Sequence, residues 1–110
     1  MDINELEPNM EEAARLMEML SQPVRLKILC HLLDGEWSVV KLAENVGLSQ
    51  PALSHHLKKL RDSGLVQTRR DAQTIYYSLK GPHVMAVLTT LSDLYCEPRQ
   101  NAERRPQAAV

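Results

Sequence analysis

The sequence predicts a mainly α-helical domain that carries one two-stranded β-hairpin. Three observations lead to this prediction. Apolar residues recur at helical spacing before residue 62 and again over 82–95. Val, Thr, Ile and Tyr dominate residues 65–79, and glycine or proline punctuates the boundaries between segments. A chain of 110 residues can bury only one modest core, so a single domain with four helices, a hairpin and a fifth helix is expected.

Two helices are expected in the first third of the chain. Residues 9–20 have an amphipathic pattern. Residues 22–33 are apolar nearly all round, which is typical of a helix in the middle of a core. The apolar residues of this second helix are Val24, Leu26, Ile28, Leu29, Cys30, Leu32 and Leu33.

Two further helices follow, joined by a very short turn. Ser38 is a good N-cap for the first of them, and Gly47 supplies the left-handed conformation in which a helix ends. Ser49 can cap the second helix, and Pro51 lies in its first turn, where a missing N–H costs nothing. This order is that of a helix-turn-helix unit.

The second helix of this unit has one apolar and one polar face. Leu53, Leu57 and Leu60 recur at i, i+4 and i+7 and are expected in the core. The opposite face and its flanks carry groups that suit base edges and phosphates. The DNA-contacting residues predicted on this helix are Ser49, Gln50, Pro51, Ser54, His55, Lys58 and Lys59.

Residues 65–70 and 74–79 are expected to form the hairpin, with 71–73 between the strands. A hairpin directly behind a helix-turn-helix is a β-wing. Arg69 and Arg70 stand beside its tip, where a wing meets the phosphate backbone. The alternative is that both arginines are ordinary solvated charges of an edge strand.

Charge is distributed unevenly along the chain, although the net charge is only −1. Residues 1–20 contain six acidic residues and one arginine, a balance of −5. Residues 49–80 contain six basic and two acidic residues, a balance of +4, on the predicted reading surface. Such polarisation is typical of an electrostatic footprint for nucleic acid, and a chance surface distribution is the alternative.

A last helix is expected from Pro82, with an apolar stripe longer than so small a domain needs for itself. The stripe consists of Val84, Val87, Leu88, Leu91, Leu94 and Tyr95. The first and last helices are therefore expected to form a homodimer. Two-fold symmetry would place two reading helices about 34–36 Å apart on double-stranded DNA and predicts a near-palindromic operator.

The expected organisation is an N-terminal extension over 1–8, the domain over 9–96 and a disordered tail over 97–110. The tail has lost apolar periodicity and contains two prolines. No signal sequence and no apolar run of bilayer length is present, so a cytoplasmic protein without membrane contact is expected.

The string LSQPALSHHLKKLRDSGLVQTRRDAQTIYYSL, with QPVRLKILCHLL before it, resembles the ArsR/SmtB family of bacterial repressors over roughly residues 10–96. The resemblance implies a dimeric winged helix with five helices and two strands. It also implies transcriptional repression that an inducer relieves. The family's groove-reading positions fall on Gln50, Pro51, Ser54 and His55.

The metal sites known in that family are incomplete here. Ser38 and Val40 occupy the positions where metal sensors often carry paired cysteines. The positions that match the zinc set read Gly81, His83, Leu94 and Glu97, so two of four ligands are missing. His83 is expected to be a surface histidine, and neither a metal nor a cofactor is expected.

Cys30 and Cys96 remain, 66 positions apart. Taken alone, Cys30 could be a small buried hydrophobic residue and Cys96 incidental, or the two could form a reversible bridge. The motifs LKILC and DLYC resemble the dithiol branch of the family, the SqrR/BigR/HlyU-like regulators. That resemblance implies that reactive sulfur species or oxidants are the inducer, and that they bridge the two cysteines through a disulfide or polysulfide and so release the DNA.

Two other classes of function compete with this reading. A metal-responsive repressor could use a non-standard site formed by Cys30, His31 and Cys96, although adjacent helical residues point about 100° apart. A thiol enzyme would need a Cys-x-x-Cys pair or a thiol with a base, and neither pattern is present. No enzymatic activity is therefore expected.

Overall fold

The computed structural model describes residues 2–96. Helices account for most of them, and three strands form one small antiparallel sheet. In chain order the elements are α1 (Ile3–Leu6), the 3-10 helix η1 (Glu7–Asn9), α2 (Met10–Met19), α3 (Pro23–Leu33), β1 (Trp37–Ser38), α4 (Val39–Val46), α5 (Gln50–Asp62), β2 (Val66–Asp71), β3 (Thr74–Leu79) and α6 (Pro82–Tyr95).

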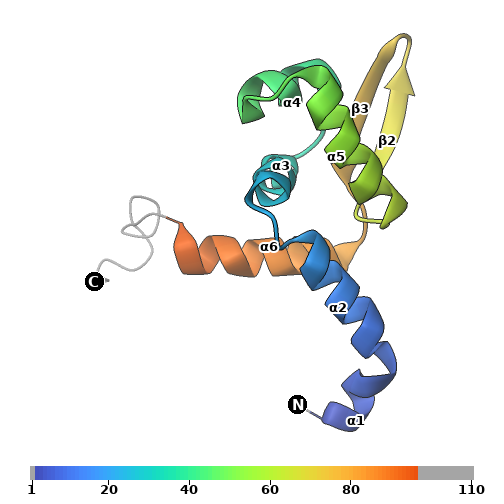
Figure 1. Ribbon diagram of the computed structural model, residues 1–110, viewed down its shortest axis with the longest axis vertical. Coiled ribbons are helices and arrows are strands. Elements are labelled where there is room, and N and C mark those ends of the chain that lie inside the picture. Colours follow the sequence, from blue (N-terminus) through green and yellow to red (C-terminus); the bar gives the residue numbers. More distant parts are fainter. Residues whose placement is uncertain (1, 97–110) are drawn as a thin grey trace.

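Figure 1 shows three parts of the molecule. A reading head contains α4, α5 and the β2–β3 hairpin. Helix α3 lies between this head and α6, and it contacts α4, β3 and α6. An N-terminal arm, formed by α1, η1 and α2, projects away from the body. The arrangement is the mainly helical domain with a β-wing that the sequence predicts.

The sheet differs from the prediction by one short strand. β2 and β3 pair antiparallel from Val66↔Leu79 to the tip, as expected of the wing. β1 adds to the other edge of β3, with Trp37 opposite Tyr77. The reason is local: Ser38 has the extended backbone of an N-cap, so the chain entering α4 already lies in strand geometry beside β3. The prediction of a two-stranded sheet was therefore incomplete.

The hairpin tip is also tighter than predicted. β2 runs to Asp71 and β3 starts at Thr74, which leaves a two-residue turn of Ala72 and Gln73. Ala72 adopts φ 58°, a left-handed conformation that a residue with a side chain adopts reluctantly. No glycine marks this turn in the sequence, so its length was misjudged by one residue.

The helix boundaries follow the capping signals closely. The Ser38 hydroxyl accepts from the Lys41 amide at 3.2 Å, and the Ser49 hydroxyl accepts from the Ala52 amide at 3.2 Å. Gly47 ends α4 with φ 79°. The Gly47 and Leu48 amides both donate to the Ala43 backbone oxygen, so the predicted turn between the two helices is confirmed.

The core lies where α3, α5 and α6 meet the sheet. Leu53, Leu57 and Leu60 of α5 are fully buried, as predicted. Helix α3 is buried on one side only: Val24 is 38 % exposed and Cys30 is exposed. The expectation of a helix surrounded by core on all sides was wrong, because none of the elements within residues 2–96 covers its second face.

Arg25 joins the N-terminal arm to α3. Its side chain is buried, with 7 % exposure, and its Nε donates to the backbone oxygen of Met19 at 2.8 Å. Nη2 donates to the Glu18 oxygen at 3.2 Å and Nη1 to Gln22 Oε1 at 3.0 Å. The last carbonyls of a helix have no intrahelical donor and carry partial negative charge. A guanidinium therefore satisfies the end of α2 and holds it against α3.

The N-terminal extension over 1–8 is helical where it is described. Asp2 caps α1 by accepting from the Asn4 amide at 2.9 Å. The predicted tail over 97–110 lies outside the described residues. Within the part that is described, no helix has the length and apolar character needed to cross a membrane.

We expect Arg25→Leu to lower the free energy of unfolding by about 2–3 kcal/mol, because two carbonyl oxygens lose a charged donor in a buried place. Lys27→Leu, at an exposed position on the same helix, is the matched control and should change it little. Urea unfolding followed by circular dichroism measures both. Equal losses in the two variants would contradict the role given to Arg25.

Candidate functional site

Helix α5 presents the predicted reading face to solvent. Gln50, Ser54 and His55 are exposed near its N-terminal end, and Lys58 and Lys59 are exposed further along. Pro51 is exposed in the first turn. The Ser49 hydroxyl oxygen accepts the capping hydrogen bond of the helix, and its O–H remains able to donate to a phosphate. The arrangement offers donors and acceptors at the end of α5 that a major groove can admit.

One of the lysines has an internal partner. Lys58 Nζ lies 3.1 Å from Asp62 Oδ2, one turn along the same exposed helix surface. An exposed pair of this kind contributes little to stability and exchanges readily with another anion. Lys58 therefore remains suited to a phosphate contact.

The two wing arginines are in different situations. Arg69 donates from Nε to Glu36 Oε2 at 2.9 Å and from Nη2 to Glu36 Oε1 at 2.8 Å. Its guanidinium also lies 4.6 Å from the ring centre of Tyr76. Hydrogen bonding from Arg69 lowers the pKa of the Glu36 carboxyl. Arg70 is exposed and projects from the other side of β2, as alternation along a strand requires. Of the predicted pair, Arg69 is therefore neutralised by Glu36, whereas Arg70 forms no ion pair among the described residues.

Glu36 was absent from the sequence prediction. It precedes β1, and 33 positions separate it from Arg69. Only the addition of β1 to the sheet brings its carboxylate to the wing. No spacing rule within one element would have revealed this pair.

His56 is a second residue that the sequence did not single out. Its Nδ1 is buried and has no hydrogen-bond partner among the described residues. Burial lowers the pKa of His56, and the charges of His55, Arg25 and Lys59 lower it further. The His55 and His56 rings meet edge to face, with centroids 5.8 Å apart. The lowered pKa favours the neutral form of His56, a residue of α5 that is close enough to Arg25 to be affected by its charge.

The two cysteines come from elements that touch each other. Cys30 is exposed on α3, Cys96 is the exposed C-cap of α6, and both are thiols without a disulfide. The thiol of Cys30 is nevertheless partly screened from water. Burial raises the pKa of Cys30, and the charges of Cys96 and Asp34 raise it further. The alternative of a fully buried Cys30 is thus wrong, and the two sulfurs are close enough to interact electrostatically.

Cys96 is tied to the helix that it ends. Its Sγ lies 3.0 Å from the Ser92 hydroxyl oxygen, and its amide donates to the Ser92 backbone oxygen at 2.8 Å. Ser92 is not among the residues that the sequence predicts at a functional site. An i,i+4 spacing of serine and cysteine was the available signal, but it gains meaning only when the helix is known to end at residue 95.

Within residues 2–96, no three His, Cys, Asp or Glu side chains gather in a way that could hold a metal ion. His31 is engaged in the fold: its Nδ1 pairs with the Lys27 backbone oxygen at 2.9 Å, and its ring packs edge to face on Trp37 at 5.5 Å. His83 is exposed at the start of α6. The non-standard metal site considered for Cys30, His31 and Cys96 therefore has no support in the geometry.

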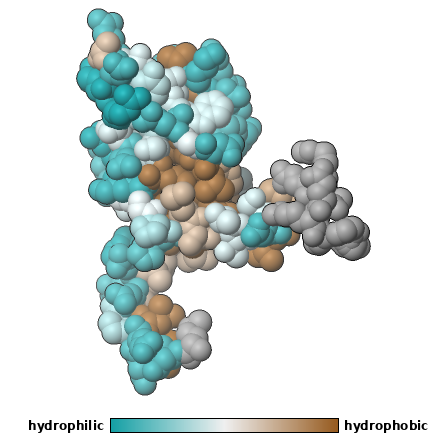
Figure 2. Space-filling model, turned by 180° about the vertical axis from the view of Figure 1, so that it is seen from behind, coloured by the Kyte–Doolittle hydropathy of each residue, from teal (hydrophilic) through white to brown (hydrophobic). Residues whose placement is uncertain are grey.

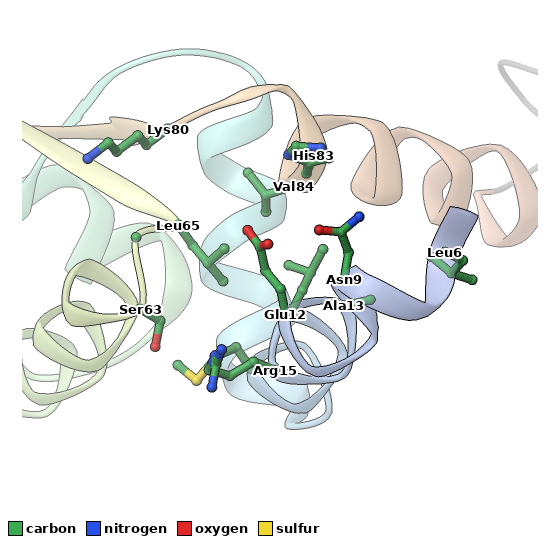
Figure 3. A pocket seen from close by; sticks show the side chains of 13 residues that line it. Leu6, Asn9, Glu12, Ala13, Arg15, Ser63, Leu65, Lys80, His83 and Val84 are labelled. Atoms are coloured by element: carbon green, nitrogen blue, oxygen red, sulfur yellow. The ribbon is translucent and has the colours of Figure 1, made fainter. Parts of the chain in front are cut away.

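A cavity of about 490 Å³ lies between the N-terminal arm, the turn after α5 and the start of α6. Figure 3 shows polar groups of Asn9, Glu12 and His83 among its apolar walls. Neither cysteine and none of the predicted DNA contacts lines it. Its lining residues are Leu6, Asn9, Glu12, Ala13, Arg15, Leu16, Met19, Ser63, Gly64, Leu65, Lys80, His83 and Val84.

Hydrophobic surface gathers on the arm and on α6. Figure 2 shows it around the crossing of α3 and α6 and at the end of the N-terminal arm. Leu94 is 69 % exposed and Tyr95 is 79 % exposed at the end of α6. The other large exposed hydrophobic residues of these elements are Ile3, Met10, Met17 and Met85. These are the two elements that the sequence assigns to a dimer surface.

His56 gives the folded state a defined pH dependence. Because its pKa is lowered on folding from the ordinary 6.5, the unfolded chain binds a proton that the native chain resists. Stability is therefore expected to fall as the pH drops below about 6.5. Unfolding free energies of His56→Gln should fall less steeply over this range, whereas the exposed control His83→Gln should follow the parent. Parallel curves for all three would contradict the assignment.

Comparison with known proteins places these features in a family. The model of the family described as "Bacterial regulatory protein, arsR family" matches residues 22–68. The chain is 45% identical to the transcriptional activator HlyU of Vibrio cholerae over 91% of its own length and 93% of that protein. The structure of reduced HlyU from Vibrio cholerae N16961 superposes with a TM-score of 0.80, at 46% identity, and covers 84% of this chain and 98% of that one.

Two further structures extend the comparison. The transcriptional repressor BigR of Xylella fastidiosa has a TM-score of 0.82 at 38% identity, covering 88% of this chain and 99% of that one. A winged helix-turn-helix DNA-binding domain, Mb0332 of Mycobacterium bovis, shares the fold at 24% identity, with a TM-score of 0.74 and coverage of 94% and 92%. The chain thus belongs to the arsR family of bacterial winged-helix transcription regulators, which are not enzymes, on the branch that contains HlyU and BigR.

Proposed function

We propose that this regulator is a homodimeric repressor that leaves a near-palindromic operator when Cys30 and Cys96 become bridged. The observation that carries the proposal is that Cys30 and Cys96 are both exposed thiols, one on α3 and one at the end of α6, and that these two helices are in contact. One of these helices supports the reading head, and the other belongs to the proposed dimer surface. A relative named as an activator and another named as a repressor both belong to this branch, and the dithiol resemblance favours repression relieved by chemistry.

On the DNA side, the N-terminal end of α5 supplies the groove contacts and the wing supplies a backbone contact. Gln50, Ser54 and His55 read base edges, and Lys58, Lys59 and Arg70 neutralise phosphates. Ser49 and Pro51 fix the helix entry, and Arg69 acts from its pair with Glu36. Two copies related by two-fold symmetry would engage successive major-groove faces.

The second copy would cover the hydrophobic surface of the arm and α6. Large apolar side chains at 69 % and 79 % exposure are unusual on a monomer that uses no partner. Within the arm, Leu16 and Met19 pack against the core of their own body, whereas Ile3, Met10 and Met17 stay exposed. A partner subunit would cover these exposed side chains of the arm.

The first chemical step falls to Cys96, because Cys30 holds its proton more strongly than an ordinary thiol. The Cys96 thiolate attacks the outer sulfur of an organic persulfide, RSSH, and forms a Cys96 persulfide while RS⁻ leaves and takes up a proton. The Cys30 thiolate then attacks the Cys96 sulfur and expels hydrosulfide. Two thiols are oxidised to a disulfide, and the transferred sulfur is reduced to sulfide. Retention of further sulfur atoms would give a polysulfide bridge.

The bridge would act by changing how α3 sits on α6. The reading head is anchored on α3, so a constraint between α3 and α6 changes the separation of two reading helices in a dimer. A coupling of about 1–3 kcal/mol weakens DNA binding roughly 5- to 150-fold, which is sufficient for induction. Such a coupling requires no unfolding of the domain.

The two-thiol mechanism predicts that Cys30→Ser and Cys96→Ser each keep operator binding but lose its response to persulfide. In the parent protein, an organic persulfide should remove two hydrogens from the intact mass and weaken operator binding. Intact-mass spectrometry and fluorescence anisotropy on the same samples measure both effects. Release of operator by either serine variant would sink the proposal, and a parallel treatment with hydrogen peroxide shows whether the response is specific to sulfur.

Salt dependence separates the two wing arginines. Arg70→Ala should lower the slope of log K against log salt by about 0.9, the amount expected for one phosphate contact. Arg69→Ala should lower it less, because Glu36 already neutralises that guanidinium. Arg15→Ala, on the arm, is the control for a general charge effect. Identical slopes for Arg70→Ala and the parent would remove the wing from the DNA interface.

A further inference from the structure

We propose that Ser92 is a positioning residue that holds the Cys96 sulfur and stabilises its thiolate, and so makes Cys96 the first of the two thiols to react. This inference rests on the proposed thiol switch. Ser92 is an additional residue for that switch, because the predicted switch consists of the two cysteines alone. Its basis is the short contact between the Ser92 hydroxyl oxygen and Cys96 Sγ, at 3.0 Å.

Both the side chain and the backbone of Cys96 are held by Ser92. The Cys96 amide donates to the Ser92 backbone oxygen at 2.8 Å, which is the last hydrogen bond of α6. Cys96 itself has left the helix, with φ −72° and ψ 153°. Its side chain therefore starts from an extended backbone, and the hydroxyl one turn earlier fixes the direction of the sulfur.

Thr90 shows what a hydroxyl on this helix otherwise does. Its Oγ1 donates to the Ala86 backbone oxygen at 2.9 Å, the usual i−4 bond of a helical Ser or Thr. The Ser92 hydroxyl lies on the cysteine sulfur instead. The two residues share the helix and the functional group but differ in their partner, so each serves as a control for the other.

The direction of this hydrogen bond follows from the charge on sulfur. A thiolate has no proton to give, so the Ser92 O–H must donate when Cys96 is ionised. A hydrogen bond to the charged form of a group favours that form. The surroundings of Cys30 act in the opposite direction, since burial, Cys96 and Asp34 all favour its protonated form. The local geometry thus gives the two sulfurs different tasks, with Cys96 attacking and Cys30 resolving.

The test measures Cys96 alone, in a Cys30→Ser background. The rate of alkylation by iodoacetamide is followed by mass spectrometry from pH 6 to 10, about two units either side of an ordinary thiol. Adding Ser92→Ala should slow alkylation at pH 7 roughly three- to tenfold, because the sulfur loses its hydrogen-bond partner. Adding Thr90→Ala should leave the profile unchanged, and Ser92→Thr, which keeps a hydroxyl, should restore most of the rate.

Unchanged profiles for Ser92→Ala would overturn the proposal, as would equal shifts in Ser92→Ala and Thr90→Ala. Helix content and operator affinity of the reduced variants exclude a general loss of structure as the cause. In the protein with both cysteines, Ser92→Ala should slow persulfide-induced release without changing its final extent. Failure of persulfide to release the parent protein would refute the switch, while the alkylation profile would still decide the role of Ser92.

Discussion

The packing of α3 is the constraint on which the rest of the structure depends. One face of this helix, with Ile28, Leu29 and Leu32, is buried and contacts α4, β3 and α6. The reading head therefore cannot shift relative to α6 without disturbing the core. The other face remains at the surface and carries Cys30. One short helix thus supports the head mechanically and places a thiol beside the end of α6.

Arg25 extends this constraint to the N-terminal arm. A buried guanidinium is costly unless its donors are satisfied, and here the satisfying groups are two carbonyl oxygens at the end of α2 and one amide oxygen. Burial lowers the pKa of His56 on α5, and the charge of Arg25 adds to this lowering. The arm, the core helix and the reading helix therefore meet around one cation.

Acidic side chains of the same chain neutralise part of the positive charge on the surface of the reading head. Glu36 forms an ion pair with the Arg69 guanidinium, and Asp62 forms one with Lys58. Compensation of this kind lowers the non-specific attraction of the head to phosphate. The two thiols likewise differ in their surroundings, since burial raises the pKa of Cys30 and the Ser92 hydroxyl contacts the sulfur of Cys96.

The sequence by itself determined helices α2 to α6, the caps of α4 and α5, the wing and the polar face of α5, because these depend on signals within a few residues: Ser38, Gly47 and Ser49 each act on a neighbouring amide or turn. It could not determine the addition of β1 to the sheet, the Arg69–Glu36 pair, the exposure of Cys30 or the orphaned Nδ1 of His56. Those features arise between residues far apart in the chain. Burial and charge at such places are set by which surfaces the fold brings together, and only the tertiary structure decides that.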